Sequence, residues 1–402
     1  MKSQFRGFLF EAKHLTGLLV AAATVAVLLY MEVGAVAQSK STLSALPSTP
    51  QAPKDNPTTP AKVALGRLLF WDPLLSGPQD VACASCHHPK NGYAEDRDLS
   101  LGTTGIGLGK SRHQAPGSTI PIVKRNSPTV LNIAFNGSDL SGSYDPATAP
   151  MFWDMRVKSL EKQALEPLKA HEEMRGNTYP EDAALAKVVA KLRANAEYRR
   201  LFAGAFGGKQ PVSAENLGRA ISAFERTLLA NNSPFDRYMR GDRSAMTEEQ
   251  VSGMKRFESV GCVKCHSGPM FSDYKLHVMG IPDNPALPAS DGGAQNTDGA
   301  QNTYAFRTPT LRNLNFTAPY EHNGMFPTLS AVVGFYEDAS GGRSRNPKVS
   351  SEKLDPLLLE LKDFDEEDVD LVAFLRALSD DKFDRTIPER VPSGLPVGGK
   401  IQ

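Results

Sequence analysis

Four cysteines and two histidines form the most informative pattern in this chain of 402 residues. Every cysteine belongs to one of two copies of the spacing Cys-x-x-Cys-His, which are Cys83, Cys86 and His87, and then Cys262, Cys265 and His266. In this pattern the two thiols form thioether bonds to a haem and the histidine binds its iron. The sequence therefore predicts two covalently bound haem c groups, and a chain with two such groups is a redox protein.

Other uses of a Cys-x-x-Cys pair explain the pattern less well. A thioredoxin-like redox pair lies in a βαβ unit, and neither copy has that setting. A zinc site needs two pairs close together, whereas one copy begins at Cys83 and the other at Cys262. Neither alternative accounts for the histidine that comes directly after both second cysteines.

The N-terminus indicates export from the cytoplasm. Basic residues precede an apolar run at residues 15–30, and Ala35 and Ala37 offer a small-x-small cleavage site. We therefore predict a signal peptide over residues 1–37, with a retained N-terminal membrane anchor as the alternative. Either form places the globular part in the periplasm.

The rest of the chain divides around the two motifs. Residues 38–58 are rich in Ser, Thr, Pro and Gln and are predicted to form a flexible tether. One motif falls in each half of the remaining chain, so we expect a duplicated unit, with an N-terminal haem domain at 59–240, a C-terminal haem domain at 241–387 and a tail at 388–402. Basic and acidic residues number 45 each, and the resulting net charge of zero argues against nucleic acid as a partner.

The hydrophobic pattern is helical, and strand-like alternation is scarce. Apolar residues recur at helical spacing over 183–206, 214–229 and 365–378. Residues Thr247 to Gln250 have the sequence of a capping box, which predicts a helix leading into the second motif. This pattern indicates several helices and few strands.

The ligand on the far side of each haem decides its function, because a capped iron favours electron transfer and an open one permits peroxide chemistry. Two long polar stretches, 99–126 and 282–302, are predicted to be either functional loops or disordered, and beside the haems they could line a pocket or form a partner surface. His113 in the first loop is a candidate ligand for the first haem. For the second haem, spacing alone leaves open His277, Met279, His322, Met325 and Tyr336.

A proton-transfer group above an open iron would complete a peroxidase. Peroxide must lose a proton from one oxygen and gain one on the other as its O–O bond breaks. One stretch of the chain supplies suitable side chains, namely Trp153, Gln163, Glu172 and Glu173. A buried tryptophan and glutamates on a solvated helix face would explain the same residues.

With these motifs the chain resembles the bacterial di-haem cytochrome c peroxidase family, including its MauG branch. The likeness covers residues 63–378 and rests on ordered segments at 65–76, 125–132, 152–154, 307–313 and 317–324. The resemblance implies an all-α fold of two cytochrome-c-like domains. It also implies that the haems face each other across the domain interface with Trp153 between them.

The resemblance also assigns roles to single residues. It implies that Glu173 is the acid and base at the first haem, with Gln163 as a hydrogen-bonding group beside it. It further implies a calcium ion between the domains, bound by the side chain of Asn126 and the backbone carbonyls of Thr317 and Pro319.

Departures from other branches of the family refine this expectation. Where those carry a histidine that can cap the first haem, this chain has Thr103, so that iron is expected to be open unless His113 caps it. Where they carry a methionine for the second haem, this chain has Tyr336, as the MauG branch does, and a phenolate stabilises ferric iron. MauG also carries a surface tryptophan before its second motif, and the matching residue here is Val260.

The leading hypothesis is a periplasmic peroxidase that reduces hydrogen peroxide with electrons from a small redox protein, either a cytochrome c or a cupredoxin. The alternative is a MauG-like enzyme that uses a high-valent di-haem state to modify a protein substrate oxidatively. A di-haem electron carrier without catalysis is the third hypothesis. Dimers occur in the family, which leaves a homodimer open.

Overall fold

The computed structural model describes residues 42–362 and 369–402, so the predicted signal peptide lies outside it. The fold is mostly helical, and six short strands form three separate antiparallel pairs, β1–β2, β3–β4 and β5–β6. The described helices are α2 (Pro60–Trp71), α3 (Cys83–Cys86), α4 (Leu160–Gln163), α5 (Ala184–Ala194), α6 (Ala196–Phe206), α7 (Ala214–Glu225), α8 (Pro234–Met239), α9 (Glu248–Val260), α10 (Gln295–Asp298), α11 (Leu329–Ser340) and α12 (Val369–Ala377). The strands are β1 (Gly105–Ile106), β2 (His113–Gln114), β3 (Pro150–Met151), β4 (Val157–Lys158), β5 (Leu276–Val278) and β6 (Ala305–Arg307).

Local sequence signals account for the helix boundaries. The capping box that opens α9 is confirmed, because the Gln250 N–H donates to Thr247 Oγ1 (3.2 Å) and the Thr247 N–H donates to Gln250 Oε1 (3.1 Å). The helix expected over 183–206 is instead two helices. Asn195 separates them, because its side chain accepts the Tyr198 N–H (3.0 Å) and so caps α6. The closing helix is α12, and residues 365–368 of its predicted span lie outside the described residues.

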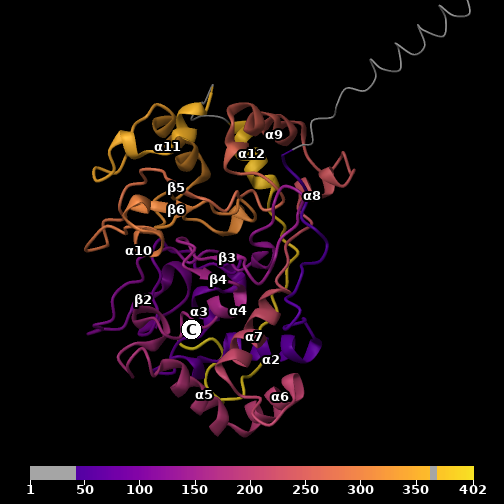
Figure 1. The fold of residues 1–402 in the computed structure, drawn as a ribbon, viewed down its shortest axis with the longest axis vertical. Coiled ribbons are helices and arrows are strands. Elements are labelled where there is room, and N and C mark those ends of the chain that lie inside the picture. Colours follow the sequence, from indigo (N-terminus) through magenta and orange to yellow (C-terminus); the bar gives the residue numbers. More distant parts are fainter. Residues whose placement is uncertain (1–41, 363–368) are drawn as a thin grey trace, which may run out of the picture. The chain divides into compact units, whose positions relative to one another are not determined.

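The two halves of the fold repeat one helix arrangement. In Figure 1, α2 and α7 lie together in one half and α9 and α12 in the other, with the β3–β4 and β5–β6 pairs between the halves. Each pair of helices meets at a glycine. A Cβ on Gly66 of α2 would lie 2.0 Å from the Ala220 carbonyl oxygen of α7, and one on Gly253 of α9 would lie 1.8 Å from that of Asp370 in α12. Only glycine permits so close an approach.

Two asparagines repeat in the same way. Asn132 and Asn313 both have positive φ, at 62° and 65°. Their backbone N–H groups donate to the carbonyls of Leu228 (2.9 Å) and Leu378 (3.2 Å), which follow α7 and α12 respectively. The Asn132 side-chain oxygen accepts the N–H of Ala230 (2.8 Å), and the Asn313 side-chain oxygen accepts that of Asp380 (3.1 Å). The duplication suggested by the two haem motifs therefore extends to individual hydrogen bonds.

The segment predicted as a flexible tether packs onto the fold. Leu43 and Leu46 are buried, and Asn56 is buried with its side-chain amide donating to Ser222 Oγ (3.2 Å). The tether prediction is therefore wrong for residues 43–58. Composition misled here because a few well-placed residues anchor a segment that is otherwise polar.

The segment predicted as a tail, 388–402, returns to the N-terminal half, where Figure 1 marks the C-terminus. Val391 is buried, and the backbone of Gly398 donates to the Trp71 carbonyl (2.8 Å) and accepts from Ser85 Oγ (2.8 Å). This segment therefore covers the first Cys-x-x-Cys-His motif, in which Ala84 and Ser85 are fully buried. The prediction of a tail over residues 388–402 is therefore wrong, because the segment packs on the fold.

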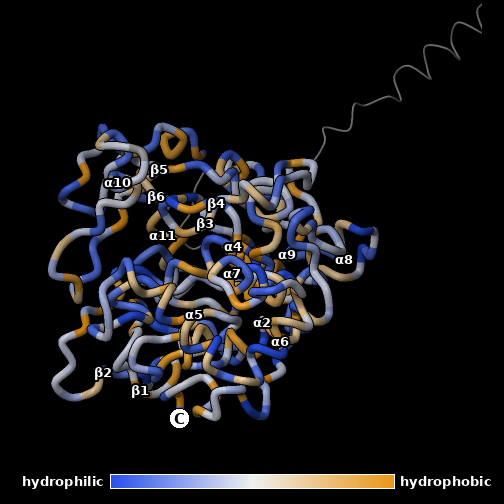
Figure 2. Tube along the Cα trace, turned by 60° about the horizontal axis from the view of Figure 1, so that its bottom comes forward, coloured by the Kyte–Doolittle hydropathy of each residue, from blue (hydrophilic) through white to orange (hydrophobic). Residues whose placement is uncertain are grey.

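The apolar core is divided among several clusters rather than gathered in one layer. Leu65, Leu192 and Leu217 belong to a cluster beneath α2, α5 and α7, and Phe257 and Phe374 belong to another beneath α9 and α12. Figure 2 agrees, since hydrophobic residues are spread over many elements of the described chain. Among the described helices, none combines the length and apolar character that crossing a bilayer requires.

The glycine contact between α2 and α7 can be tested by substitution. Gly66→Ala should destabilise the protein by about 1–3 kcal/mol, because the added methyl group has no room beside the α7 backbone. The measurement is the midpoint of urea unfolding. Gly204→Ala in α6 is the matched control, because a Cβ there meets no atom within 4 Å and alanine favours helix by about 0.5–1 kcal/mol. Equal midpoints for the two variants would contradict the assigned contact.

Candidate haem-binding site

One cavity of about 860 Å³ is lined by both halves of the chain. This volume lies near the upper end of the range for ligand pockets, roughly 300–1,000 Å³. All the predicted site residues line it, namely Cys83, Cys86, His87, Asn126, Trp153, Gln163, Glu173, Cys262, Cys265, His266, Thr317, Pro319 and Tyr336. The structure thus brings together side chains that are widely separated in the sequence.

Both motif histidines are oriented in the same way. Nδ1 of His87 lies 3.1 Å from the Tyr93 carbonyl oxygen, and Nδ1 of His266 lies 3.0 Å from that of Phe271. A carbonyl can only accept, so Nδ1 carries the proton and Nε2 keeps its lone pair for a metal. Burial lowers the pKa of both rings, which favours the neutral form that binds iron.

The four cysteines are free thiols. Cys83 and Cys86 begin and end the short helix α3, so that one helical turn sets both side chains on the same side with His87 directly after them. Burial raises the pKa of Cys83 to about 12 and that of Cys86 well above its usual value. Paired thiols and a neutral imidazole on the wall of a mainly apolar cavity fit the requirements of a c-type haem.

Glu173 lies in a tightly held turn. It belongs to the π-helical turn His171–Arg175, a rare conformation that is frequent at functional sites. The Thr103 N–H donates to the Glu173 carbonyl (2.7 Å), and the Gly77 N–H donates to that of Met174 (2.7 Å). These contacts fix the backbone from which the Glu173 side chain reaches the cavity.

The Glu173 carboxyl is suited to proton transfer. Burial, reinforced by the charge of Glu172 and opposed by that of Arg156, raises its pKa to about 7. A group with such a pKa both accepts and donates protons at neutral pH. Gln163 lines the same cavity from the end of α4, as the resemblance implies.

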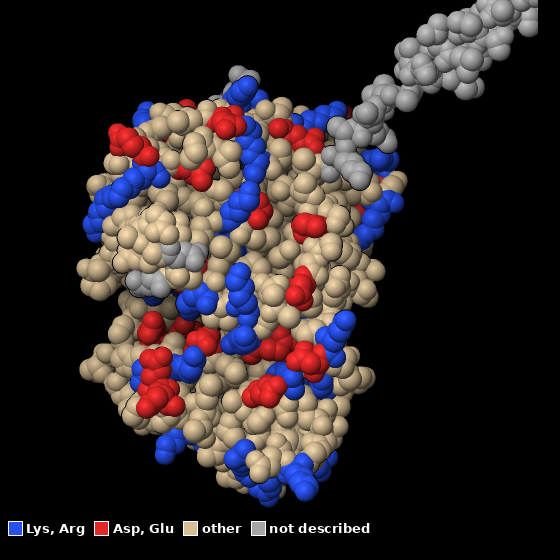
Figure 3. Space-filling model, in the orientation of Figure 1, with Lys and Arg blue, Asp and Glu red and all other residues tan. Residues whose placement is uncertain are grey.

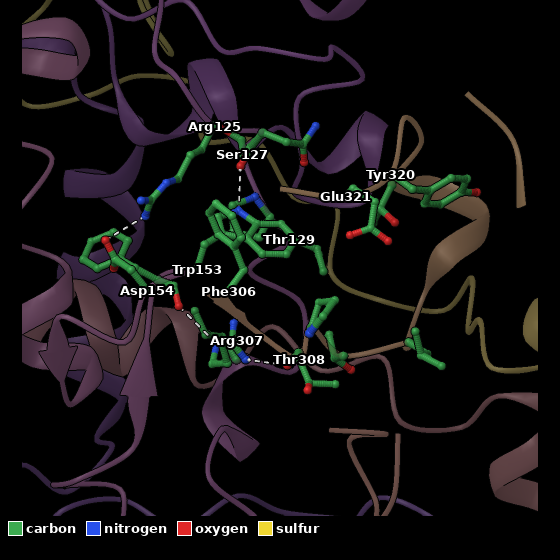
Figure 4. Close-up of a pocket in the computed structure, with 18 of the residues that line it drawn as sticks. Arg125, Ser127, Thr129, Trp153, Asp154, Phe306, Arg307, Thr308, Tyr320 and Glu321 are labelled. Carbon is green, nitrogen blue, oxygen red and sulfur yellow. Dashed lines mark hydrogen bonds and ion pairs between the residues drawn. The ribbon is translucent and has the colours of Figure 1, made fainter. Parts of the chain in front are cut away.

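Trp153 lies in the loop between β3 and β4 and is held by both halves. Its indole N–H donates to the carbonyl of Asn126 (3.1 Å), and its own carbonyl accepts the backbone N–H of Arg307 (2.7 Å). Figure 4 shows Trp153 among Arg125, Phe306 and Arg307. His322 packs edge-on to the indole at a ring-centroid distance of 6.4 Å and stacks on Phe306 at 3.6 Å.

A buried charge network supports the tryptophan loop. Arg125 pairs with Asp154, the residue after Trp153, at 2.8 Å, and its Nη2 donates to Asp291 Oδ1 at 3.0 Å. Asp154 also accepts from Arg156 at 2.9 Å. Asp291 belongs to the polar stretch 282–302, which was predicted to be either a functional loop or disordered. That loop therefore contributes a carboxylate that helps to fix the residue beside Trp153.

The structure separates the candidate ligands of the second haem. His277 is occupied at both ring nitrogens, by Asp355 (2.6 Å) and Asp273 (3.1 Å). Although burial opposes it, hydrogen bonds to Asp273, Cys265 and Asp355 raise the pKa of His277 to about 11. His322 and Met325 do not line the cavity, whereas Met279 and Tyr336 do. Burial, reinforced by the charge of Glu321, raises the pKa of the Tyr336 phenol well above its usual value.

For the first haem, His113 lies away from the cavity. It is exposed on β2, where its Nδ1 contacts the Ser111 carbonyl (3.1 Å), and it does not line the cavity. Thr103 is buried and engaged with the turn that carries Glu173. Thr103 has no imidazole, and that of His113 does not reach the cavity, so neither residue caps the first haem from the position described.

Known proteins support the same assignment. A sequence model of the family described as di-haem cytochrome c peroxidase matches residues 60–244. The cytochrome-c peroxidase IdrP1 of Pseudomonas sp. (strain SCT) is 35% identical to this chain, and the match covers 84% of this chain and 85% of the relative. The methylamine utilization protein MauG of Methylorubrum extorquens is 34% identical, with 85% of each chain covered.

The chain belongs to the di-haem cytochrome c peroxidase family. It is therefore an oxidoreductase of the peroxidase class that uses two haems. The fold agrees, since the crystal structure of a MauG-like protein associated with microbial copper homeostasis matches with a TM-score of 0.67 at 30% identity. That match covers 83% of this chain and 95% of the other.

Sequence reasoning missed the charges around Trp153 in this di-haem peroxidase. Arg125 stands in a segment that carried the resemblance, but nothing in the sequence pairs it with Asp291, which lies 166 residues away. The stacking of His322 on Phe306 also had no sequence signal. The sequence offered one hint of charged groups near Trp153, since segments 125–132 and 307–313 both begin with an arginine.

A larger residue at Gly102 should displace the turn that carries Glu173. A Cβ on Gly102 would lie 2.1 Å from the Glu173 carbonyl oxygen and 2.2 Å from that of Glu172. Gly102→Ala should therefore shift the carboxyl and lower peroxide turnover by about 100-fold, as a displacement of about 1 Å can. Steady-state assays with Thr103→Ser as control test this, because that variant keeps the N–H bonded to Glu173. A folded Gly102→Ala enzyme with normal turnover would refute the role of this contact.

Proposed function

We propose that this di-haem peroxidase is periplasmic, with one haem attached at Cys83 and Cys86 and the other at Cys262 and Cys265. His87 and His266 would bind the two irons. The main support is that one cavity contains both motifs, the Trp153 ring held by both halves, and a carboxyl group at Glu173 with a pKa near 7. The substrate is hydrogen peroxide.

The haems supply the redox chemistry that cleaves the O–O bond, and the side chains manage the protons. As a carboxylate, Glu173 takes a proton from one peroxide oxygen; as the acid, it delivers a proton to the departing oxygen, which leaves as water. Gln163 orients the peroxide by hydrogen bonding. Two electrons and two protons in all convert one peroxide into two waters.

Electrons would enter at the second haem. Lys264 within the second motif is exposed, whereas Ala84 and Ser85 within the first are fully buried under the C-terminal segment. The donor, a small cytochrome c or cupredoxin, would therefore dock near the second motif, and Trp153 would relay electrons to the first haem. On the face in Figure 3, basic and acidic side chains are interspersed, so a single-sign patch would not select the donor there.

Tyr336, together with His266, would hold the iron of the second haem. It lines the cavity from α11, and as a phenolate it would favour the ferric state. An electron carrier without catalysis would need both irons capped on both sides, and the residue at the usual cap position of the first is Thr103. A ferric EPR spectrum with one high-spin haem would exclude the carrier.

A calcium ion would stabilise the cavity near Trp153. Asn126, Thr317 and Pro319 all line the cavity, and Nδ2 of the Asn126 amide donates to the Pro319 carbonyl oxygen (3.4 Å), so the amide would turn its oxygen towards a bound ion. Amide and carbonyl oxygens with water form the shell that calcium prefers. Because the carbonyl of Asn126 also accepts the Trp153 indole N–H, the ion would help to fix the relay residue.

Oxidative modification of a protein substrate is the second candidate, and Tyr336 is the observation that favours it, since the MauG branch shares this residue. The position of MauG's surface tryptophan speaks against an identical route, because Val260 there is only 1% exposed. Turnover with a small donor protein supports the peroxidase. Failure of such donors, together with oxidised side chains on a co-purifying protein, would support the alternative.

The role of Glu173 predicts a pH dependence. The carboxylate form takes the first proton, so the rate of reaction with peroxide should rise as pH increases through about 7. Glu173→Gln should lower that rate about 10²–10⁴-fold. Glu172→Gln is the control, because removing a charge that raises the pKa should move the inflection to lower pH without loss of the maximal rate. Stopped-flow measurements of all three proteins decide the matter, and an unaffected Glu173→Gln enzyme would exclude the assignment.

The role of Tyr336 predicts a spectral change at one haem. Tyr336→Met should shift the low-spin signals of the second haem in the ferric visible and EPR spectra and raise its reduction potential, because a thioether replaces an anionic ligand. Tyr320→Phe is the control, since Tyr320 also lines the cavity but is not a proposed ligand. If the Tyr336→Met spectra equal those of the unmodified protein, Tyr336 is not the ligand.

A further inference from the structure

The described part of the chain contains five buried arginines, and four of them have a carboxylate partner. These pairs are Arg112 with Glu95 (3.4 Å), Arg125 with Asp154 (2.8 Å), Arg226 with Glu161, and Arg312 with Asp236 (3.0 Å). This pattern agrees with the high free energy of burying an unpaired charge. The fifth arginine is Arg307.

Arg307 is 8% exposed but forms no ion pair with any carboxylate in residues 42–362 and 369–402. Its Nε donates to the Phe152 carbonyl (3.1 Å), its Nη1 lies 3.5 Å from the Thr308 carbonyl, and its guanidinium lies 5.6 Å from the ring centre of Tyr274. These neutral contacts satisfy some of its five donors. They supply no negative charge to balance a guanidinium that stays protonated even when buried.

The acidic side chains of Asp273 and Asp154, which are linked to residues beside or bonded to Arg307, are already engaged. Oδ1 of Asp273 accepts from Thr308 Oγ1 (2.8 Å), and its Oδ2 lies 3.1 Å from His277 Nε2. Asp154 is shared between Arg125 and Arg156. The counter-charge of Arg307 therefore has to come from a group inside the cavity, which Arg307 lines.

The position of Arg307 identifies the side of the cavity on which this group lies. Arg307 is in β6 and pairs with Leu276 of β5, the first strand after the second haem motif. The next residue, Thr308, is bonded to Asp273, whose N–H donates to the carbonyl of Cys265 (2.8 Å). Arg307 is thus joined to Cys265 through a short chain of hydrogen-bonded residues.

We propose that Arg307 binds a propionate carboxylate of the haem attached at Cys262 and Cys265. This inference rests on the proposed attachment of that haem. A guanidinium forms a bidentate, charge-assisted pair with a carboxylate, which is the strongest hydrogen-bonded contact available to it. Because the backbone N–H of Arg307 also donates to the Trp153 carbonyl (2.7 Å), the same residue would fix the edge of the second haem relative to the relay residue; Figure 4 shows Trp153 and Arg307 in the cavity lining.

The test is a spectroelectrochemical titration that resolves the two haems. In Arg307→Gln the reduction potential of the second haem should fall, because the lost cation no longer offsets the propionate charge and ferric iron is favoured. The pH at which that potential changes should rise, because the propionate loses the partner that favours its ionised form. Arg307→Lys, which keeps the charge without the planar fork, should show a smaller shift in the same direction.

Lys275→Gln is the matched control, because it removes the same charge from an exposed residue directly before β5. It should leave both potentials unchanged. The proposal is overturned if Arg307→Gln leaves the potential and its pH dependence unchanged, or shifts only the first haem. If Arg307→Gln does not fold, unchanged values for Arg307→Lys overturn it equally.

A haem count separates this inference from the proposed function. The pyridine haemochrome assay of the unmodified protein should give two covalent haems per chain. Fewer than two would refute the proposed attachment and, with it, this inference. Two haems together with an unshifted Arg307→Gln potential would refute only the assignment of Arg307.

Discussion

The attachment of Trp153 to both halves of the chain is the constraint on which the site depends. Asn126 from the first half accepts the indole N–H, and Arg307 from the second half donates to the backbone carbonyl. Asn126 is itself fixed from the second half, because its N–H donates to the His322 carbonyl (2.7 Å). Each bond contributes only about 0.5–1.5 kcal/mol, but a buried partner left unbonded costs about 1–3 kcal/mol. The halves therefore cannot slide without several such losses at once.

Around this junction, a duplicated framework carries unequal chemistry. The same helix contacts at Gly66 and Gly253 and the same asparagine bonds at Asn132 and Asn313 build both halves. The differences lie in the groups that reach the cavity. The first half places the carboxyl of Glu173 and the amide of Gln163 there, and its haem motif is covered by the C-terminal segment. The two halves thus share the contacts that build the scaffold and differ in the side chains that line the cavity.

The sequence predicted what depends on neighbours in the chain. The haem motifs and the Thr247 capping box are local patterns. Both motifs line the cavity, and the capping box is confirmed by its hydrogen bonds. Local composition failed where distant contacts decide, as at Asn56, which the sequence placed in a tether and which bonds to Ser222 in α7. Glu173 needed the family resemblance, since its pKa arises from burial that only the fold creates. Arg307 was beyond either source, because its significance is the lack of a partner, which requires coordinates.

The Glu173 carboxyl also makes the stability of the fold depend on pH. Its pKa is raised from an ordinary 4.5 to about 7, so the folded state holds the proton more tightly than the unfolded chain. Its contribution to stability is therefore fully present below about pH 4.5 and is lost as pH rises towards 7, on the order of 1.4 kcal/mol for each pH unit between the two pKa values. The raised pKa that suits Glu173 to proton transfer therefore lowers the stability of the fold at neutral pH. The backbone bonds from Thr103 and Gly77 oppose the resulting tendency of the turn to open, which explains why so short a segment is held from two sides.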